Sequence, residues 1–195
     1  MISLVLGLGN IGERYGGSRH NIGFAVLNEV AAQLKASPRP AGDHNLVADV
    51  TIGDRAVRLA WPTTLMNRSG WAAVELVDRM RLDPAEVLVV VDDYNLPLGR
   101  LRFRSGGSDG GHNGLASLIE HLETDDFPRL RLGIGPVADA EDVVDFVLGQ
   151  FDPGDRETVD AMITAAAEAV RFAITHRLEE AMSKYNRNPA LPDAS

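Results

Sequence analysis

The segment GLGNIGERYGGSRHNIG, residues 7–23, joins a predicted strand to a predicted helix. The apolar run Ile2–Leu6 before it is typical of a strand that is buried on both faces. After it, Asn21 is the predicted N-cap of a helix, and apolar side chains recur at helical spacing over residues 24–34. A connection this long and polar between packed elements is more often functional than decorative. We therefore take Asn10 and His20 as the first candidate site residues.

The glycines that begin this segment match the dinucleotide motif G-x-G-x-x-G. In that motif the third glycine already lies inside a helix whose N-terminus meets the pyrophosphate. Here Glu13–Ser18 separate Gly12 from the helical period, and no acidic residue ends a second strand at the required distance. The pattern therefore argues against a nucleotide site. His20 remains, because an imidazole in a polar loop titrates near neutrality and suits a general base.

The rest of the chain predicts further strands and helices within one unit. A hairpin is predicted around Gly53–Arg55, whereas residues 37–44 before it show no periodicity. Strands are predicted at 87–91, 100–104 and 129–134. Helices are predicted at 71–80 and 115–122. A long helix is predicted to start at 153, and a final helical segment to end at about 187. Val87–Val91 is the most hydrophobic strand, so we place it centrally in the sheet. Residues 188–195 are expected to be a frayed tail.

The composition is that of an ordinary soluble domain. The 195 residues suffice for one domain with a sizeable core. No apolar run approaches the roughly 18 residues of a membrane span, and the N-terminus lacks a signal-peptide pattern. Zero cysteines excludes disulfides and thiol nucleophiles and suits the cytoplasm. The formal charge of −9 argues against a nonspecific nucleic-acid coat, but a local basic patch would still attract phosphate.

Two groups of charged residues lie in predicted strands or directly after one. Asp92 and Asp93 end the central strand, where open α/β sheets bind ligands, although solvated carboxylates are the simpler reading. The sequence has no H-E-x-x-H and no His, Asp and Glu at metal-ligand spacing, so we predict no metal. Arginines alternate with apolar residues in two strands that we expect to be neighbours, and they precede a glycine-rich loop that opens a helix. This pattern predicts a site for a phosphate-bearing ligand, with a solvated strand face as the alternative. The arginines are Arg100, Arg102, Arg104, Arg129 and Arg131.

Ser108 lies in a match to the nucleophile motif G-x-S-x-G. That motif needs a tight strand-to-helix turn with the serine at its apex. Residues 111–114, two of them glycine, still separate Ser108 from the helical period, so the turn is too loose. A serine hydrolase is therefore the weaker interpretation. We read His44, His121 and His176 as structural or surface residues.

Several motifs occur together in one order along the chain. They are GLGN at 7–10, RHN at 19–21, TLMNRSG at 64–70, DDYNLP at 92–97, GGHNG at 110–114 and RLRLGIG at 129–135. In order and spacing the chain resembles the bacterial-type peptidyl-tRNA hydrolases from residue 2 to about 187. The resemblance implies a single α/β domain over 1–187, with a twisted mixed β-sheet sandwiched by α-helices. It also implies a cytoplasmic monomer that hydrolyses peptidyl-tRNA without metal or cofactor.

The resemblance also assigns roles to individual residues. It makes His20 the base that activates water and Asp92 the group that orients it. It places Arg104 and Arg131 on the 5′ phosphate of tRNA, and makes residues 137–149 a lid, with a gate around His112. Substrate binding falls to Asn10, Tyr15, Met66, Asn67, His112 and Asn113.

Three positions depart from the usual pattern of this family. Ile11 stands where proline is usual, Asn95 where aspartate is usual, and Asp109 where the loop is often neutral or basic. Asp109 is expected to weaken binding of the tRNA phosphate somewhat. A non-catalytic RNA-binding relative that serves splicing is the alternative function, and retention of His20 and Asp92 together with the asparagines favours the enzyme.

Overall fold

A seven-stranded mixed β-sheet forms the centre of the protein in a computed structural model that describes residues 1–137 and 142–187. The strand order is β2-β3-β4-β1-β5-β7-β6. The strands are β1 (Leu4–Gly7), β2 (Arg39–Ala41), β3 (Asn45–Ile52), β4 (Arg55–Pro62), β5 (Val87–Pro97), β6 (Leu101–Arg104) and β7 (Arg129–Gly135). β1 runs parallel to β4 and β5, and β5 runs parallel to β7, whereas β2, β3 and β6 are antiparallel to their neighbours.

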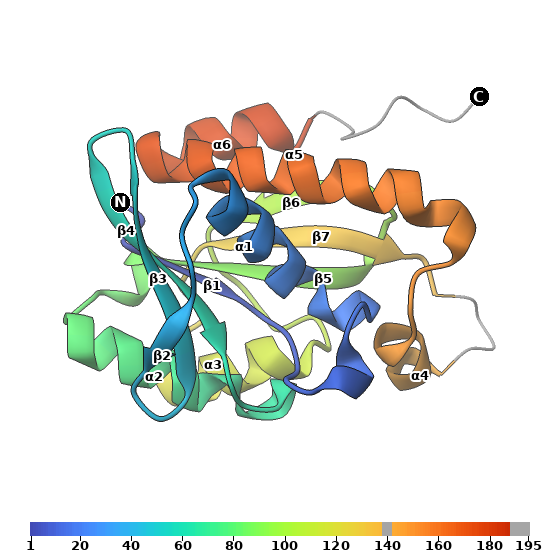
Figure 1. The fold of residues 1–195 in the computed structure, drawn as a ribbon, viewed down its shortest axis with the longest axis horizontal. Helices are drawn as coiled ribbons and strands as arrows, with labels where there is room; N and C mark the ends of the chain where they lie inside the picture. The colour runs from blue at the N-terminus through green and yellow to red at the C-terminus, as the bar shows by residue number, and fades with distance from the viewer. Residues whose placement is uncertain (138–141, 188–195) are drawn as a thin grey trace.

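Helices cover both faces of this sheet (Figure 1). The helices are α1 (Ile22–Gln33), α2 (Ser69–Met80), α3 (Asn113–Leu122), α4 (Val143–Leu148), α5 (Arg156–Thr175) and α6 (Leu178–Tyr185). α1, α5 and α6 lie on one face, and α2 and α3 lie on the other. The predicted fold class, a mixed sheet between helices, is confirmed. The predicted tail, residues 188–195, lies outside the described residues.

The two core strands have apolar side chains on both faces of the sheet, as their continuous apolar sequences predict. In β1, Val5 packs into the core under α1 and α5, whereas Leu4 and Leu6 pack into the core under α2 and α3. In β5, Leu88 and Val90 alternate with their neighbours in the same way. β5 lies between β1 and β7, so its predicted internal position is correct.

Glycines at the two ends of the opening segment let α1 pack directly against the sheet. A Cβ on Gly7 would lie 2.6 Å from the carbonyl oxygen of Gly23, and a Cβ on Gly23 would lie 2.5 Å from the carbonyl oxygen of Val90. Side chains at either position would separate the helix from the sheet. The long loop between them is therefore anchored at both ends, and this anchoring holds His20 against β5.

Some local features differ from the prediction. β2 is a short edge strand within residues 37–44, where the sequence shows no alternation. β5 continues past Val91 to Pro97 because its polar end pairs with β7 across a register shift. Asn21 occupies the N-cap position of α1, but its side chain makes no capping bond and is used elsewhere.

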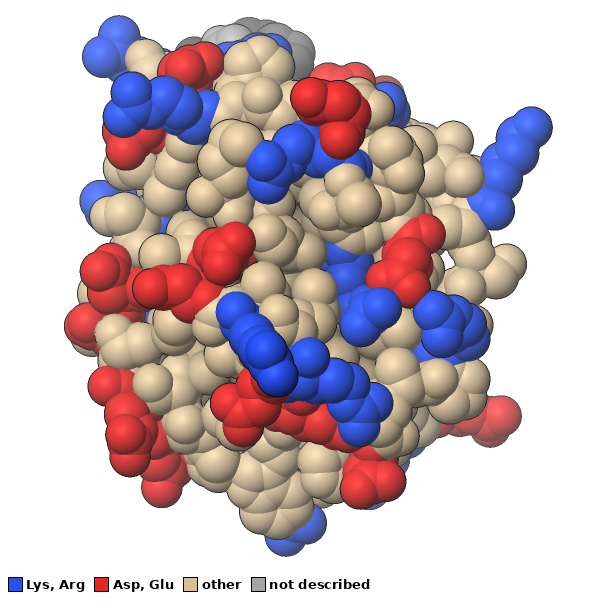
Figure 2. Space-filling view, turned by 90° about the vertical axis from the view of Figure 1, so that its left-hand side faces the viewer, with Lys and Arg blue, Asp and Glu red and all other residues tan. Residues whose placement is uncertain are grey.

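The described surface carries both signs of charge. On the side of the molecule seen in Figure 2, basic and acidic side chains lie intermingled. Several of the charges are paired, as in the contacts of Asp49 with Arg39 and Arg58. Across residues 1–137 and 142–187, none of the helices has the length and apolar character that crossing a membrane would require.

Candidate active site

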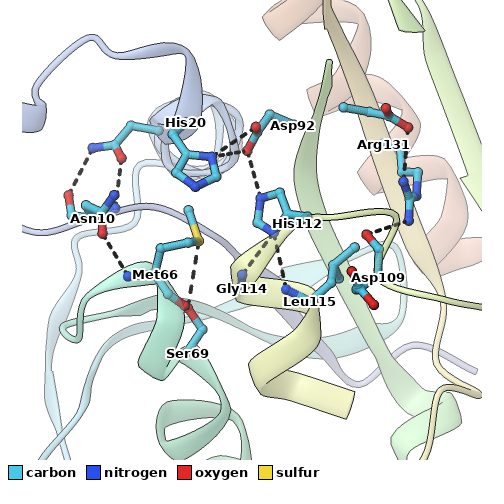
Figure 3. Close-up of polar contacts among 12 residues, drawn as sticks. Asn10, His20, Met66, Ser69, Asp92, Asp109, His112, Gly114, Leu115 and Arg131 are labelled. Atoms are coloured by element: carbon cyan, nitrogen blue, oxygen red, sulfur yellow. Dashed lines mark hydrogen bonds and ion pairs between the residues drawn. The ribbon is translucent and has the colours of Figure 1, made fainter. Parts of the chain in front are cut away.

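Three side chains from distant parts of the sequence meet where β5 continues past the carboxyl end of β1 (Figure 3). Asp92 comes from β5, His20 from the short 3₁₀ helix η2 (Arg19–Asn21), and His112 from the N-cap position of α3. All three residues are buried, with exposed fractions of 2%, 7% and 6%. The structure therefore brings together the two residues expected to be catalytic and one expected to bind substrate.

Asp92 accepts hydrogen bonds from both imidazoles. His20 Nδ1 lies 2.9 Å from both carboxylate oxygens, and His112 Nε2 lies 3.0 Å from Oδ1. Because an ionised carboxylate only accepts, His20 donates its Nδ1–H and keeps the lone pair on Nε2. The ring centroids of the two histidines are 4.7 Å apart. The second ring nitrogen of His20, Nε2, thus faces away from Asp92.

The tautomer of His112 is fixed by the start of α3. Its Nδ1 accepts hydrogen bonds from the backbone N–H groups of Gly114 and Leu115, at 3.1 and 3.2 Å. A nitrogen that accepts cannot also carry the proton, so the proton of the neutral ring lies on Nε2, which faces Asp92. His112 therefore serves Asp92 as a donor in this arrangement.

The charge state of Asp92 follows from these two contacts. Burial by itself raises the pKa of the carboxyl, but His112 and His20 outweigh burial and hold the pKa of Asp92 well below its usual value. Asp92 is therefore ionised at neutral pH although it lies in the interior. Asp92 therefore presents a fixed negative charge to the two imidazoles.

His20, Asp92 and His112 also form a group of possible metal ligands, with their ligand atoms within 4.8 Å of one another. The sequence spacing could not reveal this group, because its members come from three separate segments. For His112 to bind a metal through Nε2, its proton would have to move to Nδ1, where two backbone N–H groups already point. The hydrogen-bonding pattern therefore fits an Asp–His pair better than a metal centre.

Asn10 is fixed beside this cluster by a network of amide contacts (Figure 3). Its backbone N–H donates to Asn21 Oδ1 at 2.8 Å, and its carbonyl accepts from Asn21 Nδ2 at 3.0 Å. Its side-chain oxygen accepts the backbone N–H of Met66 at 2.7 Å. The Asn10 amide oxygen is thus occupied, and its N–H₂ group remains as the donor. The RHN motif that contains His20 also contains Asn21, but the motif alone did not indicate that Asn21 holds Asn10.

The other residues expected to bind substrate surround this network at different depths. Met66 is buried at the start of the 3₁₀ helix η3 (Met66–Arg68), and Asn67 next to it is exposed. Asn113 is exposed at the first position of α3. Tyr15 is half-buried in the 3₁₀ helix η1 (Glu13–Tyr15), where its hydroxyl contacts Arg14. The two exposed asparagines are therefore accessible to a ligand.

The arginines of β6 and β7 lie side by side, and we call Arg102, Arg104, Arg129 and Arg131 the arginine strip. Its members differ in exposure. β6 pairs with β7 so that Arg102 lies opposite Arg131 and Arg104 lies opposite Arg129. Arg102 and Arg104 are exposed, whereas Arg129 is 1% exposed. Burial, aided by the charge of Arg131, lowers the pKa of Arg129 to about 10. The strip is thus continuous along the sheet but only partly open to a ligand.

The two members of the strip on β7 hold the glycine-rich loop. Arg129 donates to the carbonyl oxygens of Ser108 and Asp125, at 2.8 and 3.0 Å. Arg131 donates to the same Ser108 carbonyl and to that of Asp109, and it pairs with Asp93 at 3.1 Å. The ion pair between Asp93 and Arg131 was not predicted from the sequence.

Comparison with known proteins gives a consistent result. The family model described as peptidyl-tRNA hydrolase matches residues 4–192. The chain is 44% identical to the peptidyl-tRNA hydrolase of a Synechocystis species, covering 97% of this chain and 98% of the relative. It is 42% identical to that of Aquifex aeolicus, with coverage of 95% and 97%. The crystal structure of the peptidyl-tRNA hydrolase from Acinetobacter baumannii superposes with a TM-score of 0.91 at 32% identity, covering 97% of both chains. The chain belongs to the peptidyl-tRNA hydrolase family.

The three departures from the usual pattern of the peptidyl-tRNA hydrolase family lie at the edges of the site. Ile11 is 44% exposed next to Asn10. Asn95 is exposed, and its backbone N–H donates to Asp93 at 2.9 Å. Asp109 accepts the backbone N–H of Gly111 through its carboxylate. None of these three side chains contacts Asp92 or the two histidines among the hydrogen bonds of the described residues.

Proposed function

We propose that this protein hydrolyses the ester that joins a peptide, or an N-blocked amino acid, to the 3′ ribose of tRNA. The observation that carries the proposal is the buried pair of His20 and Asp92, which leaves His20 Nε2 with a lone pair. Membership of the peptidyl-tRNA hydrolase family supports the choice of substrate. We also keep the expectation that the protein acts in the cytoplasm as a monomer.

In this proposal His20 acts as a general base. Nε2 takes a proton from a water molecule, whose oxygen attacks the ester carbonyl and forms a tetrahedral intermediate. The intermediate collapses with cleavage of the bond to the 3′ oxygen, which receives the proton from Nε2. Asp92 holds the ring through Nδ1–H and stabilises the imidazolium that forms between the two steps. His112 donates to Asp92 and keeps that carboxylate in place.

The asparagines suit a substrate that presents peptide groups. Asn10 has its oxygen occupied by the N–H of Met66, so its N–H₂ is directed to an acceptor such as a carbonyl. Asn67 and Asn113 are exposed and offer both donor and acceptor groups. Such side chains pair with a peptide backbone without selecting its side chains. We assign Tyr15 and Met66 to the walls of the same site.

The proposal also places the tRNA 5′ phosphate on the arginine strip. Arg104 is exposed and supplies an accessible guanidinium. Arg131 contributes positive charge, although Asp93 and the loop carbonyls already occupy part of its donors. The proposed lid, residues 137–149, includes α4, while residues 138–141 of it lie outside the described residues.

Release of an N-acetylated, radiolabelled aminoacyl group from tRNA by the purified protein tests the proposal. We expect repeated turnover well above spontaneous hydrolysis in buffer. A non-catalytic RNA-binding relative would bind the tRNA in a filter assay without accelerating release. Binding at the spontaneous rate of release would therefore contradict the enzymatic function.

A further inference from the structure

The 3₁₀ helix η2, which carries His20, lies beside α4 and is bonded to the segment that ends α4 (Figure 1). The backbone N–H of Arg19 donates to the carbonyl oxygen of Gly149 at 2.9 Å. Next to it, Ser18 forms an isolated antiparallel bridge with Gln150. Because η2 has only three residues, its own hydrogen bonds fix it weakly. Its position therefore depends on contacts with neighbouring elements.

The side chain of Arg19 makes most of its contacts with the C-terminal end of α4. Its Nη1 donates to the carbonyl oxygen of Phe146 at 3.2 Å, one of the last carbonyls of that helix. Its guanidinium carbon lies 4.4 Å from the centre of the Phe146 ring and 5.5 Å from that of Phe151. Both distances are within the range of cation–π contacts. The side chain is only 12% exposed, so these contacts are largely shielded from water.

A surface ion pair contributes little to this junction. Asp152 lies 3.9 Å from Arg19 Nη2, and its side chain is 80% exposed. An exposed pair at that distance is weak and is screened by salt. The junction between η2 and α4 therefore depends on the carbonyl of Phe146, the two phenyl rings and the backbone contact of Gly149.

His20 is thus held from two sides. Asp92 fixes the imidazole ring through Nδ1. The backbone that carries the ring continues into α1 on one side, and on the other side it is bonded to α4 through Arg19. Release of Arg19 would let this backbone shift, and Nε2 would then move relative to a bound substrate.

We propose that Arg19 is a positioning residue, which fixes η2 against the end of α4 and thereby fixes His20 Nε2. The effect on rate rests on the hydrolase function proposed above. The effect on the ring rests on the contacts of Arg19 alone. Rate and ring position are therefore measured separately, so that either part can fail alone.

Arg19→Met is the first test. Methionine keeps an apolar stem beside the two phenyl rings but removes the charge and the donor to Phe146. We expect kcat to fall about tenfold or more with KM changed by less than about twofold, because a misplacement of 1 Å can cost about 10²-fold in rate. A melting curve establishes that the variant is folded. Wild-type kcat in the folded variant, or a rise in KM alone, would overturn the positioning role.

Gly149→Ala tests the junction from the side of α4. A Cβ on Gly149 would lie 3.0 Å from Arg19 Nη1, and the backbone φ of −70° suits alanine. The methyl group should displace the guanidinium and lower kcat, by a smaller factor than Arg19→Met. Gly154→Ala is the matched control and should leave kcat unchanged, because a Cβ there would meet no atom within 4 Å.

The double variant decides whether the two substitutions act through one junction. Gly149→Ala should lower kcat little further in the Arg19→Met background, since the contact that it disturbs is already lost. An equal fall in both backgrounds would show that the two residues act separately and would overturn the proposal. If Arg19→Met does not fold, the comparison of Gly149→Ala with Gly154→Ala carries the test, and equal kcat values would overturn the proposal.

NMR measures the position of the ring without any hydrolysis. The Nδ1–H of His20 donates to a buried carboxylate, so it should give a downfield proton signal that is absent in His20→Ala. The signal should persist in Gly154→Ala and be broadened or lost in Arg19→Met, through faster exchange with water. An unchanged signal in Arg19→Met would overturn the proposal. If the wild-type protein hydrolyses nothing, the proposed function fails while this signal still decides the role of Arg19.

Discussion

The His20–Asp92–His112 cluster and the arginine strip on β6 and β7 differ in how far their charged side chains are enclosed and in what those side chains contact. In the cluster, one carboxylate is buried between two imidazoles, and every contact serves its position. In the strip, Arg129 and Arg131 use their donors on loop carbonyls, while Arg104 stays exposed. The cluster is thus a closed, preorganised unit, and the strip combines structural and accessible cations. A single substitution in the cluster should therefore greatly reduce kcat, whereas a substitution in the strip should have a smaller effect that depends on which arginine is replaced.

His20→Ala should have the largest effect. It removes the proposed base, and kcat should fall by about 10²–10⁴. Asp92 keeps its hydrogen bond to His112, so the variant should fold and still bind tRNA. Release of the N-blocked aminoacyl group measures kcat, and a filter assay measures binding. His176→Ala, at an exposed position, is the control and should retain full activity. Full activity in His20→Ala would remove the cluster from the mechanism.

Asp92→Asn should reduce kcat by less than the factor of about 10²–10⁴ expected for His20→Ala, because the base remains but loses its orienting charge. The folded-state pKa of Asp92 lies below its unfolded value, so its contribution to stability is present above the unfolded pKa and is lost as pH falls through the folded pKa. The unfolding free energy of the wild-type protein should therefore decline with acid more steeply than that of Asp92→Asn. Urea unfolding from pH 7 to pH 2 measures both curves. Parallel curves would contradict an ionised, stabilising Asp92.

The cluster also illustrates how far sequence alone leads. Residue type and loop context identified His20, and the motif pattern identified Asp92, yet the two are 72 positions apart and their contact exists only in the fold. The role of His112 as a donor depends on two backbone N–H groups at the start of α3. Sequence spacing carries no information about such contacts. The grouping of His20, Asp92 and His112 could not be read from the sequence for the same reason, since the three residues come from separate segments.

More of the fold could be predicted from the sequence, because the hydrophobic pattern and the observed burial agree in β1 and in most of β5. The prediction stopped at Val91 because residues 92–97 are too polar to resemble a buried strand, although they pair with β7. It missed β2 because three residues including a proline show no alternation. The arginines of β6 and β7 were correctly placed on one face, whereas Arg100 precedes the first residue of β6. The period of two cannot show that Asp93 pairs with Arg131.

Arg131→Ala and Arg104→Ala should separate the two kinds of cation in the strip. Arg104→Ala should raise KM a few-fold, reduce the salt dependence of binding by roughly one phosphate contact, and leave stability within about 0.5 kcal/mol. Arg131→Ala should also destabilise the fold by about 1–3 kcal/mol, because it leaves the buried carboxylate of Asp93 without its cation and releases the loop.

Substrates with and without the tRNA 5′ phosphate, together with urea unfolding, measure these effects. The rise in KM should be largest for the phosphorylated substrate in both variants. Equal rises on both substrates would remove the strip from phosphate binding. Equal stabilities of the two variants would show that Arg104 and Arg131 contribute equally to the fold. The contrast between the strip and the cluster would then no longer hold.

Ser108→Ala should have the smallest effect, a change in kcat and KM of less than about twofold. Ser108 is exposed. Arg129 and Arg131 donate to its backbone carbonyl, which the substitution leaves in place. The loop therefore serves the strip through its backbone, whereas it serves the cluster through the side chain of His112. Steady-state hydrolysis by Ser108→Ala beside the wild-type enzyme measures this difference. Loss of turnover on the scale of His20→Ala would instead make Ser108 a nucleophile, and the division between a catalytic cluster and a binding strip would no longer hold.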